Sequence, residues 1–454
     1  MMTSRAIARM AATSRQRRLW SSSSSSSLAH CIVHPDNPIN MSDYGYMLKQ
    51  ESIALFPAQP RGSSKLLRVD SRGEVSYYNH FGNVIPHLIN GCHVIFNNSR
   101  VLDARLSVRL ITGGTPVELM LLDLGSIDPT SPCNENVIPA MIRSELIVTG
   151  DKLIEPVSGV TIEVVNINGL WEEELESGGN GTDCIVLIHS SEGLETFLTN
   201  NGSVPIPPYI KREAVPSDKE RYNNVYAKFA GSVAAPTAGL HFTDEVLTIL
   251  GETNISKLTL HVGAGTFKPV LSKDARKHSM HAENFSVNVK ELKSIIHAME
   301  RGKPLAVVGT TSVRTLESLY WLGVKRLLSR KTKSDNSMSQ EVDDLGQFDW
   351  IALSAVVDLY NISPTSALRA MIDNMQDDEF VSGKTSLMIT PKSYFFKVVD
   401  HLITNFHAPD STLMLLVSAF LSKSNVAKIY EDAQRDGYRF LSYGDVCLFS
   451  KPEP

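Results

Sequence analysis

Residues 105–203 carry the pattern that most constrains the fold of this chain. Gly, Asn and Pro divide the stretch into short β-rich runs, among them RLSVRLI, PVELMLLDL, TIEVVNI and CIVLIHS. Apolar and polar residues alternate in several of these runs, which is the period of a strand with one buried face. Several short strands of this kind predict a small antiparallel barrel. The runs contain no recognisable catalytic constellation, so we expect a lever or a partner-contact module.

The sequence on either side of this stretch has a mixed character. Residues 92–97 (CHVIFN) and 305–308 predict buried strands, and the second is followed by Gly309-Thr310-Thr311-Ser312 and a helix. A strand that leads into a helix N-terminus is where open α/β sheets bind ligands, through unpaired N–H groups. Residues 44–56 predict a further short helix, ended by Pro57.

We therefore predict a mixed α/β fold. Residues 41–104 and 205–454 are assigned to a discontinuous α/β domain, either barrel-like or three-layered, and residues 105–204 to an all-β barrel domain. That the barrel is inserted into the α/β domain is what the family resemblance described below implies. Residues 329–347 are polar and mixed in charge, as in a disordered loop.

Composition narrows the class of protein. The chain has 454 residues, 42% hydrophobic and 20% charged, as in a soluble globular protein. Its longest strongly apolar run, residues 413–421, is far shorter than the ~20 residues that span a bilayer, so we expect no transmembrane helix. The five cysteines are scattered and lack a CxxC motif, which argues against a disulfide framework or a zinc site and fits a reducing compartment.

The first 40 residues differ from the rest. Residues 1–35 contain five arginines, no acidic residue and a run of seven serines, which is typical of an organellar transit peptide. A mitochondrion or plastid is the predicted location, and the alternative is a disordered tail on a cytoplasmic protein. Without the five arginines the formal net charge goes from −5 to −10, so an acidic body must bind any polyanion through a local basic patch.

Such a patch is present in residues 205–228. Basic and aromatic residues are interleaved there, including Tyr209, Lys211, Arg212, Arg221 and Tyr222. Guanidinium and ammonium groups meet phosphates while aromatic rings stack on unpaired bases, so the stretch suits RNA. The alternative is a solvated loop whose tyrosines pack in the ordinary way.

Six segments together resemble a known family. PPYIKR, ERYNNVYAKFAGSVAAPTAGLHF, LTLHVGAGTFKPV, VGTTSVRTLES, FKVVDHLITNFHAPDSTLMLLVSAF and FLSYGD resemble, in this order, the S-adenosylmethionine:tRNA ribosyltransferase-isomerases of queuosine biosynthesis. The resemblance covers most of residues 41–450. FNNSRVLDARL also matches, but Asn98 stands where the family usually has Asp, so Asn98 receives no catalytic role. Residues 329–383 have little counterpart and are interpreted as an insertion.

The resemblance implies a reaction. The ribosyl part of S-adenosylmethionine is transferred to 7-aminomethyl-7-deazaguanine at the tRNA wobble position and isomerised, giving epoxyqueuosine in tRNA, with release of adenine and methionine. It implies no metal and no cofactor other than S-adenosylmethionine as co-substrate, no membrane, and a tRNA anticodon loop as partner; we expect a monomer. The chemistry needs a base beside the sulfonium, an acid for the departing adenine and a neutral amine.

The matching motifs supply the candidate site residues. Histidine, with a pKa of ~6.5, suits proton transfer and a carboxylate can orient it, but base and acid are not distinguished and a packing role is open for each. The catalytic candidates are His241, His261, His281, Glu283, Asp400 and His407. The substrate-binding candidates are Tyr209, Lys211, Arg212, Arg221, Tyr222, Thr237, Gly263, Gly265, Thr266, Thr310, Thr311, Ser312, Arg314, Asn405 and Tyr443.

Some of these candidates have a more specific expectation. Arg314 lies in the first turn of a predicted helix, where a cation is unfavourable, so we expect it to have a partner anion. Phe406 or Tyr443 could stack on adenine, and Asn405 could hydrogen-bond to sugar hydroxyls or a base edge.

Two other functions remain open at this point. His278, His281 and Glu283 form HxxHxE, a spacing found in metal sites, so a metal-dependent hydrolase is one alternative. The second is a non-catalytic tRNA-binding protein that keeps the scaffold and has lost the chemistry. Metal analysis and an adenine-release assay discriminate between the three functions.

Overall fold

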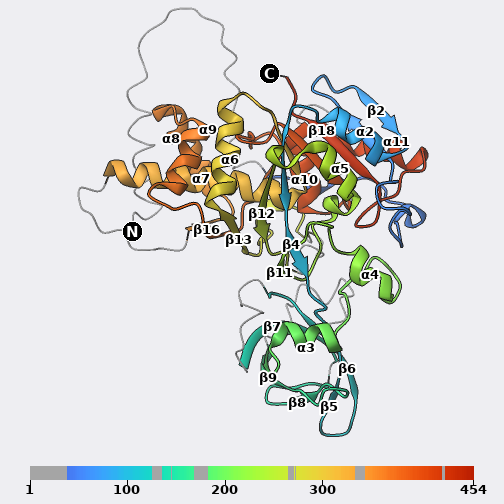
Figure 1. Cartoon of the computed structure of the whole chain (residues 1–454). Helices are drawn as coiled ribbons and strands as arrows, with labels where there is room; N and C mark the ends of the chain where they lie inside the picture. Colours follow the sequence, from blue (N-terminus) through green and yellow to red (C-terminus); the bar gives the residue numbers. More distant parts are fainter. Residues whose placement is uncertain are drawn as a thin grey trace, which may run out of the picture.

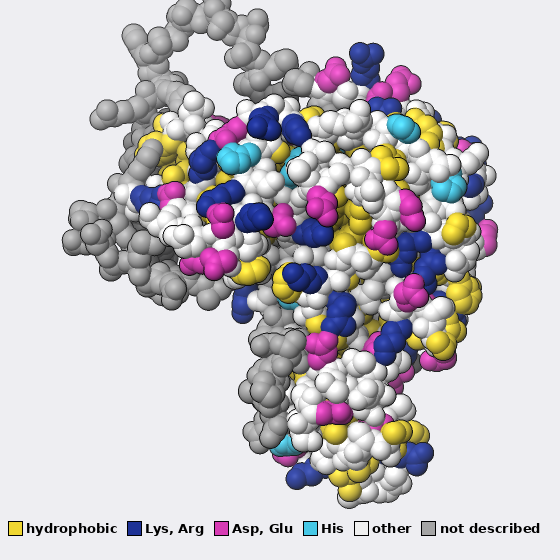
Figure 2. Space-filling view, in the orientation of Figure 1, with side chains coloured by type: hydrophobic (Ala, Val, Ile, Leu, Met, Phe, Trp, Pro, Cys, Tyr) yellow, Lys and Arg dark blue, Asp and Glu magenta, His cyan; other side chains and the backbone are white. Residues whose placement is uncertain are grey.

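In the computed structural model the chain forms a large α/β body and a smaller barrel (Figure 1). The structure describes residues 38–124, 135–144, 146–167, 182–263, 270, 272–332, 343–421 and 425–453. The predicted leader up to residue 37 and two candidate site residues, Gly265 and Thr266, lie outside these ranges. In space-filling view the barrel projects from the body, and basic and acidic side chains are mixed over the visible face (Figure 2).

A ten-stranded sheet forms the centre of the body. Its order is β15 (Asp343–Leu345), β16 (Phe380–Thr385), β13 (Glu283–Asn288), β12 (Ile255–Leu260), β3 (His93–Asn97), β14 (Leu305–Val308), β17 (His401–Asn405), β18 (Val446–Ser450), β1 (Leu66–Val69) and β2 (Val75–Tyr78). The neighbouring strands β12, β3, β14 and β17 are parallel to one another. Their carboxyl ends therefore lie along one edge of the sheet.

Both faces of this sheet are covered. On β3, Ile95 points into the core beneath α6 (Val289–Glu300), α7 (Thr310–Thr332) and α9 (Pro364–Ile372), whereas Val94 and Phe96 point into the core beneath α2 (Phe81–Leu88) and α5 (Asp244–Leu250). The alternation follows from the two-residue period of a strand. The body is thus three-layered, one of the two forms that the sequence left open.

The smaller unit is a closed antiparallel barrel of six strands. In barrel order these are β10 (Thr182–His189), β7 (Glu135–Arg143), β6 (Pro116–Leu121), β5 (Arg105–Leu110), β8 (Lys152–Ile154) and β9 (Thr161–Ile167). Cys184, Val186 and Ile188 of β10 point into its apolar interior, which α3 (Leu194–Asn201) covers with Phe197. The predicted mixed α/β fold with an inserted β-barrel is confirmed.

A short ribbon joins the two units. The strands β4 (Ser99–Val101) and β11 (Phe229–Ser232) pair in parallel, and α4 (Pro216–Arg221) follows the barrel in the chain. The chain therefore leaves the body after β4 and returns to it through α4 and β11.

Residues 343–383 are more regular than expected for an insertion. They form β15, α8 (Asp349–Tyr360), α9 and β16, and the two strands extend one edge of the sheet. Helix α9 packs closely on α7 at Gly323. A Cβ at this position would lie only 2.0 Å from the carbonyl oxygen of Ala367, so the contact requires glycine. The predicted disordered loop is wrong at both ends, since α7 reaches Thr332 and β15 begins at Asp343; residues 333–342 lie outside the described ranges.

The helix predicted for residues 44–56 is also wrong. Only two 3-10 turns, Met41–Tyr44 and Gln50–Ser52, form there. The side chain of Gln434 accepts a hydrogen bond from the Lys49 N–H and donates one to the Met47 carbonyl. These contacts with α11 (Val426–Arg435) satisfy backbone groups that a helix would have paired internally.

The apolar helix after β17 is α10 (Thr412–Leu421), and its residues from Met414 to Leu421 are buried. No single helix in the described ranges is long and apolar enough to cross a membrane. Only α10 and α11 taken together pass that test, as a pair bent by 105°.

Candidate active site at the carboxyl ends of the central strands

A cavity of about 250 Å³ lies where the central parallel strands end. Val262 follows β12, Gly309 follows β14, and Phe406 and His407 follow β17. The crevice outside the carboxyl ends of the strands is where open α/β sheets bind ligands. Of the residues predicted from sequence, the cavity brings together Tyr209, Thr237, Thr310, Thr311, Arg314, Asn405 and His407.

The N-terminus of α7 opens into this cavity. Gly309 has φ +89°, a conformation that favours glycine, and it turns the chain from β14 into the helix. Thr310 and Thr311 begin the helix and line the cavity. Because the first N–H groups of a helix have no intrahelical acceptor, this end can receive an anion. Ser312 lies one residue further on, and its hydroxyl donates back to the Val308 carbonyl at 2.6 Å.

The anion that pairs with Arg314 is a side chain of the protein itself. The Arg314 guanidinium donates to the carboxylate of Glu283 and to the Leu387 carbonyl at 3.2 Å, and both side chains of the pair are more than nine-tenths buried. The partner that the sequence required is thus another candidate site residue, at the start of β13. Arg314 lines the cavity, so this pair forms a charged but neutralised part of its wall.

His407 faces the same cavity from the loop after β17. Its Nε2 lies 2.9 Å from Oγ1 of Thr404, and its carbonyl accepts a hydrogen bond from the Tyr46 hydroxyl at 2.5 Å. Burial lowers the pKa of His407 to about 4, so the ring is neutral at neutral pH. This differs from the ordinary histidine pKa expected from sequence.

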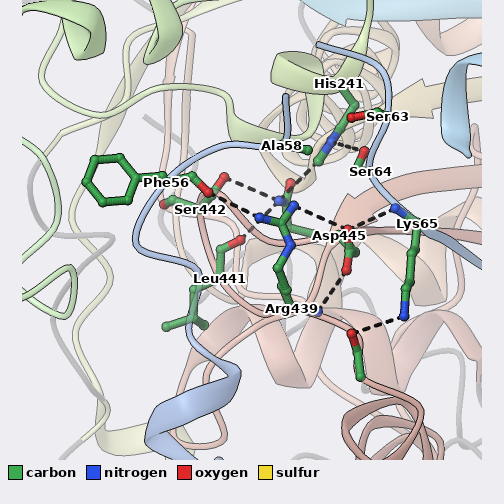
Figure 3. A network of polar contacts seen from close by, with 12 residues as sticks. Phe56, Ala58, Ser63, Ser64, Lys65, His241, Arg439, Leu441, Ser442 and Asp445 are labelled. Atoms are coloured by element: carbon green, nitrogen blue, oxygen red, sulfur yellow. Dashed lines mark hydrogen bonds and ion pairs between the residues drawn. The ribbon is translucent and has the colours of Figure 1, made fainter. Parts of the chain in front are cut away.

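His241 lies behind the cavity wall in a buried chain of hydrogen bonds (Figure 3). It ends the 3-10 turn Thr237–His241; its Nδ1 is 2.7 Å from the Ser64 hydroxyl and its Nε2 is 3.3 Å from Nδ2 of Asn405. An amide nitrogen can only donate, so Nε2 accepts and Nδ1 carries the proton in this network. Burial, with Arg439 as a smaller cause, lowers the pKa of His241 to about 3.

Asn405 joins this chain to the cavity. Its amide nitrogen also donates to the carbonyls of Leu441 at 3.1 Å and Ser442 at 3.4 Å. The amide is therefore oriented, and its Oδ1 is buried without a hydrogen-bond partner among the described residues. A buried acceptor without a partner is costly. Because Asn405 lines the cavity, a ligand donor could satisfy it.

Some of the basic and aromatic residues that were expected to contact RNA instead contact other side chains of the protein. Arg212 donates to both oxygens of Asp218, at 2.7 and 2.8 Å, and Tyr443 donates to the same carboxylate at 2.7 Å. Tyr222 and Tyr443 are buried and pack edge-to-face with ring centroids 5.7 Å apart. Neither ring can stack on a base or on adenine, because neighbouring side chains cover both.

Other members of this stretch remain accessible. Lys211 is exposed, and Arg221 is half-buried and donates to the Ala58 carbonyl at 2.8 Å. Tyr209 reaches the cavity, where its hydroxyl lies 2.6 Å from that of Ser442. The stretch therefore connects the cavity to the surface.

Four catalytic or stacking candidates lie outside the cavity or are packed. Asp400 precedes β17 and accepts the Leu305 N–H at 2.8 Å, at the strand end opposite Asn405, so its catalytic role is withdrawn. His281 is exposed before β13. The His261 ring lies against Gly231 of β11 and does not line the cavity. The Phe406 ring packs on Phe440 with centroids 4.4 Å apart, which excludes stacking on adenine.

Gly263 follows Val262 at the end of the described part of that loop, and a Cβ there would lie 3.4 Å from the Leu122 carbonyl oxygen. In HxxHxE, the Glu283 carboxylate is occupied by Arg314 while His281 is exposed, so these side chains do not converge on a shared ion.

Sequence reasoning missed Ser64, Ser442 and Asp218. Ser64 follows Gly62, whose φ of +89° marks a turn into β1, and Asp218 lies in the first turn of α4 after a helix-starting proline. Ser64 and Asp218 thus each lie beside a local sequence signal, a glycine turn and a helix start. Neither signal predicts the distant residue that the side chain contacts.

Comparisons with known proteins agree on one family. A family model described as queuosine biosynthesis protein matches residues 41–341 and 362–449. A protein of Sulfurihydrogenibium sp. is 34% identical over 90% of this chain and 99% of its own length, and one of Clostridioides difficile is 33% identical over 89% and 98%. Both are named S-adenosylmethionine:tRNA ribosyltransferase-isomerase. The predicted insertion at residues 329–383 is therefore too long, because the family model leaves only residues 342–361 of it unmatched.

A solved structure was also matched. It is an S-adenosylmethionine tRNA ribosyltransferase from Thermotoga maritima, with a TM-score of 0.41 and 23% identity over 90% of this chain and 99% of that one.

Proposed function

This chain belongs to the queuosine biosynthesis protein family, and we propose that it is an S-adenosylmethionine:tRNA ribosyltransferase-isomerase. It transfers the ribosyl moiety of S-adenosylmethionine to the aminomethyl group of 7-aminomethyl-7-deazaguanine at the tRNA wobble position. The ribose is isomerised to the epoxycyclopentanediol, and adenine and methionine leave.

The main geometric support for this proposal is the lining of the cavity. The cavity at the carboxyl ends of β12, β14 and β17 is lined by the start of α7, by Arg314 and by Asn405, whose Oδ1 is buried without a partner in the described structure. S-adenosylmethionine offers groups that match these features: a carboxylate, an ammonium group, ribose hydroxyls and the adenine amine.

We assign the carboxylate of S-adenosylmethionine to the N-terminus of α7. The unpaired N–H groups there favour an anion, and the hydroxyls of Thr310 and Thr311 add donors. Arg314 keeps its positive charge beside this site but shares it with Glu283. A carboxylate held in this way places the rest of the donor substrate along the cavity, towards Asn405.

Asn405 supplies a hydrogen-bond acceptor for the ligand. Its Nδ2 is committed to His241 and two backbone carbonyls, so its Oδ1 can only accept from the ligand. The donor is a hydroxyl or amine of the adenosine part. His241 then acts as a positioning residue, because it contacts Asn405 and Ser64 and does not line the cavity.

His407 is our candidate for the base that removes the proton beside the sulfonium. Burial keeps the ring neutral, which is the form that accepts a proton, and Thr404 orients it through Nε2. A sulfonium in the cavity raises the acidity of the adjacent C–H, which offsets the low basicity of a buried imidazole.

The direct test is to incubate the purified protein with S-adenosylmethionine and tRNA that carries the 7-aminomethyl-7-deazaguanine precursor. Free adenine and epoxyqueuosine in the tRNA, both detected by liquid chromatography and mass spectrometry, are the expected products. tRNA without the precursor should release no adenine. Binding of the precursor tRNA without adenine release would favour the non-catalytic alternative.

Two further proposals concern location and assembly. The composition of the leader supports import into a mitochondrion or plastid, and a fusion of residues 1–40 to a fluorescent reporter should enter an organelle, whereas a diffuse cytosolic signal would contradict import. We also propose that the protein is a monomer in solution, which light scattering at increasing concentrations would check.

A further inference from the structure

Phe56 is an exposed aromatic side chain on a rigid support. The residue is 52% exposed, and its ring points away from the polar network around Ser442 and Asp445 (Figure 3). The guanidinium of Arg212 lies over the ring, with Cζ 4.1 Å from the ring centroid. A half-exposed phenylalanine is unremarkable alone, but this ring is held from below by a cation.

The contacts around Phe56 fix both ring and backbone. Arg212 is held by the two oxygens of Asp218 and by the Leu55 carbonyl at 2.9 Å, so it cannot swing away from the ring. Arg439 donates to the carbonyl of Phe56 at 3.2 Å. A pre-positioned ring loses little conformational entropy when a flat partner stacks on it.

Two cations without carboxylate partners lie next to this platform. Arg61 donates to the carbonyls of Asn223 at 3.1 Å and Leu240 at 3.2 Å, and Arg221 donates to that of Ala58. Neither guanidinium has an ion pair within the described part of the chain. Both line a hollow of about 10 Å³ with Pro57 and Ala58, and Glu220 and Asp244 offset part of the Arg61 charge. A phosphate over the mouth of this hollow would lie near both guanidinium groups.

The platform is adjacent to the cavity. Ser442 lines both the cavity and the hollow that contains Arg61 and Arg221. Tyr443, the next residue, has its ring 6.0 Å from the Arg212 Cζ. Phe56 is thus linked through Arg212 and Tyr443 to Ser442 in the cavity wall.

We propose that Phe56 is the stacking platform for an unpaired base of the tRNA anticodon loop next to the wobble nucleotide, and that Arg61 and Arg221 receive the backbone phosphate beside it. This inference rests on the proposed function, because it takes the wobble nucleotide as the occupant of the cavity. Tyr222 and Tyr443, the rings that the sequence offered for stacking, are buried, so Phe56 takes their place.

The experiment measures the dissociation constant of precursor-bearing tRNA for wild type, Phe56→Ala, Phe56→Leu and Phe56→Trp. Base–aromatic stacking is lost in the first two and kept in the third, so we expect about 5- to 100-fold weaker binding for Ala and Leu and near wild-type binding for Trp. The affinity for S-adenosylmethionine should stay unchanged, because Phe56 does not line the cavity, and the melting temperature should fall by no more than the loss of one half-exposed cation–π contact explains. An anticodon stem-loop with 2-aminopurine beside the wobble nucleotide should lose its fluorescence quenching with Phe56→Leu.

The outcomes separate this inference from the proposed function. Unchanged tRNA affinity in Phe56→Ala and Phe56→Leu, in an enzyme that releases adenine, would overturn the platform and leave the function in place. Equal weakening by Leu, Ala and Trp would also overturn it, since shape rather than stacking would then matter. If wild type releases no adenine but binds tRNA in a Phe56-dependent way, the platform holds and the proposed activity fails.

Discussion

Asn405 donates a hydrogen bond to Nε2 of His241 across 3.3 Å, and this contact fixes the histidine as an acceptor on that side. The other ring nitrogen then donates to Ser64, so a neutral His241 is built into the wall behind the cavity. The same amide leaves its Oδ1 for a ligand. In our proposal, His241 thus acts through Asn405, the residue that it contacts.

The first prediction separates His407 from His281. Replacing His407 by Ala should lower the rate constant of adenine release by about 100-fold or more, the range typical of a lost general base. His281→Ala is the matched control, because His281 is exposed and away from the cavity, and its rate should stay within about twofold. Single-turnover adenine release measures both. A normal rate for His407→Ala would remove it from the mechanism.

The buried pair of Arg314 and Glu283 should matter for stability as well as binding. Glu283→Gln leaves the guanidinium buried beside a neutral amide, and we expect a loss of roughly 3 kcal/mol in the free energy of unfolding. Asp377→Asn is the control, because the Asp377–Lys293 pair is largely exposed and should contribute nothing measurable. Urea titration followed by circular dichroism compares the two; equal effects would show that burial of the pair is unimportant.

The neutral histidines predict how stability depends on pH. The unfolded state protonates His407 below a pKa of ~6.5, whereas the folded state resists protonation down to about pH 4. The stabilisation is therefore complete above pH 6.5 and declines as the pH falls towards 4. Between pH 7 and 5.5 His407 should account for a loss of roughly 1 kcal/mol, so His407→Gln should show a flatter dependence in urea unfolding. An unchanged slope would contradict the neutral, buried state.

Lys211 should contribute to RNA binding through its charge alone. It is exposed and has no ion pair in the described structure, so Lys211→Ala should not change the melting temperature. One lost phosphate contact should reduce the slope of log affinity against log salt by about 0.7 to 0.9. Lys290→Ala on α6 is the control and should keep the wild-type slope. The idea fails if both variants behave alike in filter-binding titrations from low to moderate salt.

Much of the architecture followed from local patterns. Alternating runs predicted the barrel, and the sequence after residue 305 predicted the strand and helix that form β14 and α7. The strand-to-helix pattern predicted a ligand site at Thr310, which lines the cavity, whereas Asn405 was proposed from the family resemblance. Each of these elements depends on residues that are close together in the sequence. Hydrophobic periodicity and turn residues report on this short range.

The errors came from contacts between distant residues. Asp400 and Asn405 belong to one motif, but Asp400 precedes the five-residue strand β17 and Asn405 ends it. Only the direction of this strand in the sheet shows which end meets the cavity. The pairing of Arg212 with Asp218 and Tyr443 likewise buries rings that composition marked as available. Phe56 was missed because its role depends on Arg212, far along the chain.

The central claim is that the cavity beside Asn405 holds S-adenosylmethionine while Phe56, Arg61 and Arg221 hold RNA. Isothermal titration of S-adenosylmethionine into Asn405→Ala tests it most directly, with tRNA affinity and melting temperature confirming that the variant is folded. The account predicts at least about tenfold weaker binding of S-adenosylmethionine, because a buried acceptor made for the ligand is lost, and little change in tRNA affinity. Wild-type affinity for S-adenosylmethionine in the folded variant would place the donor substrate elsewhere.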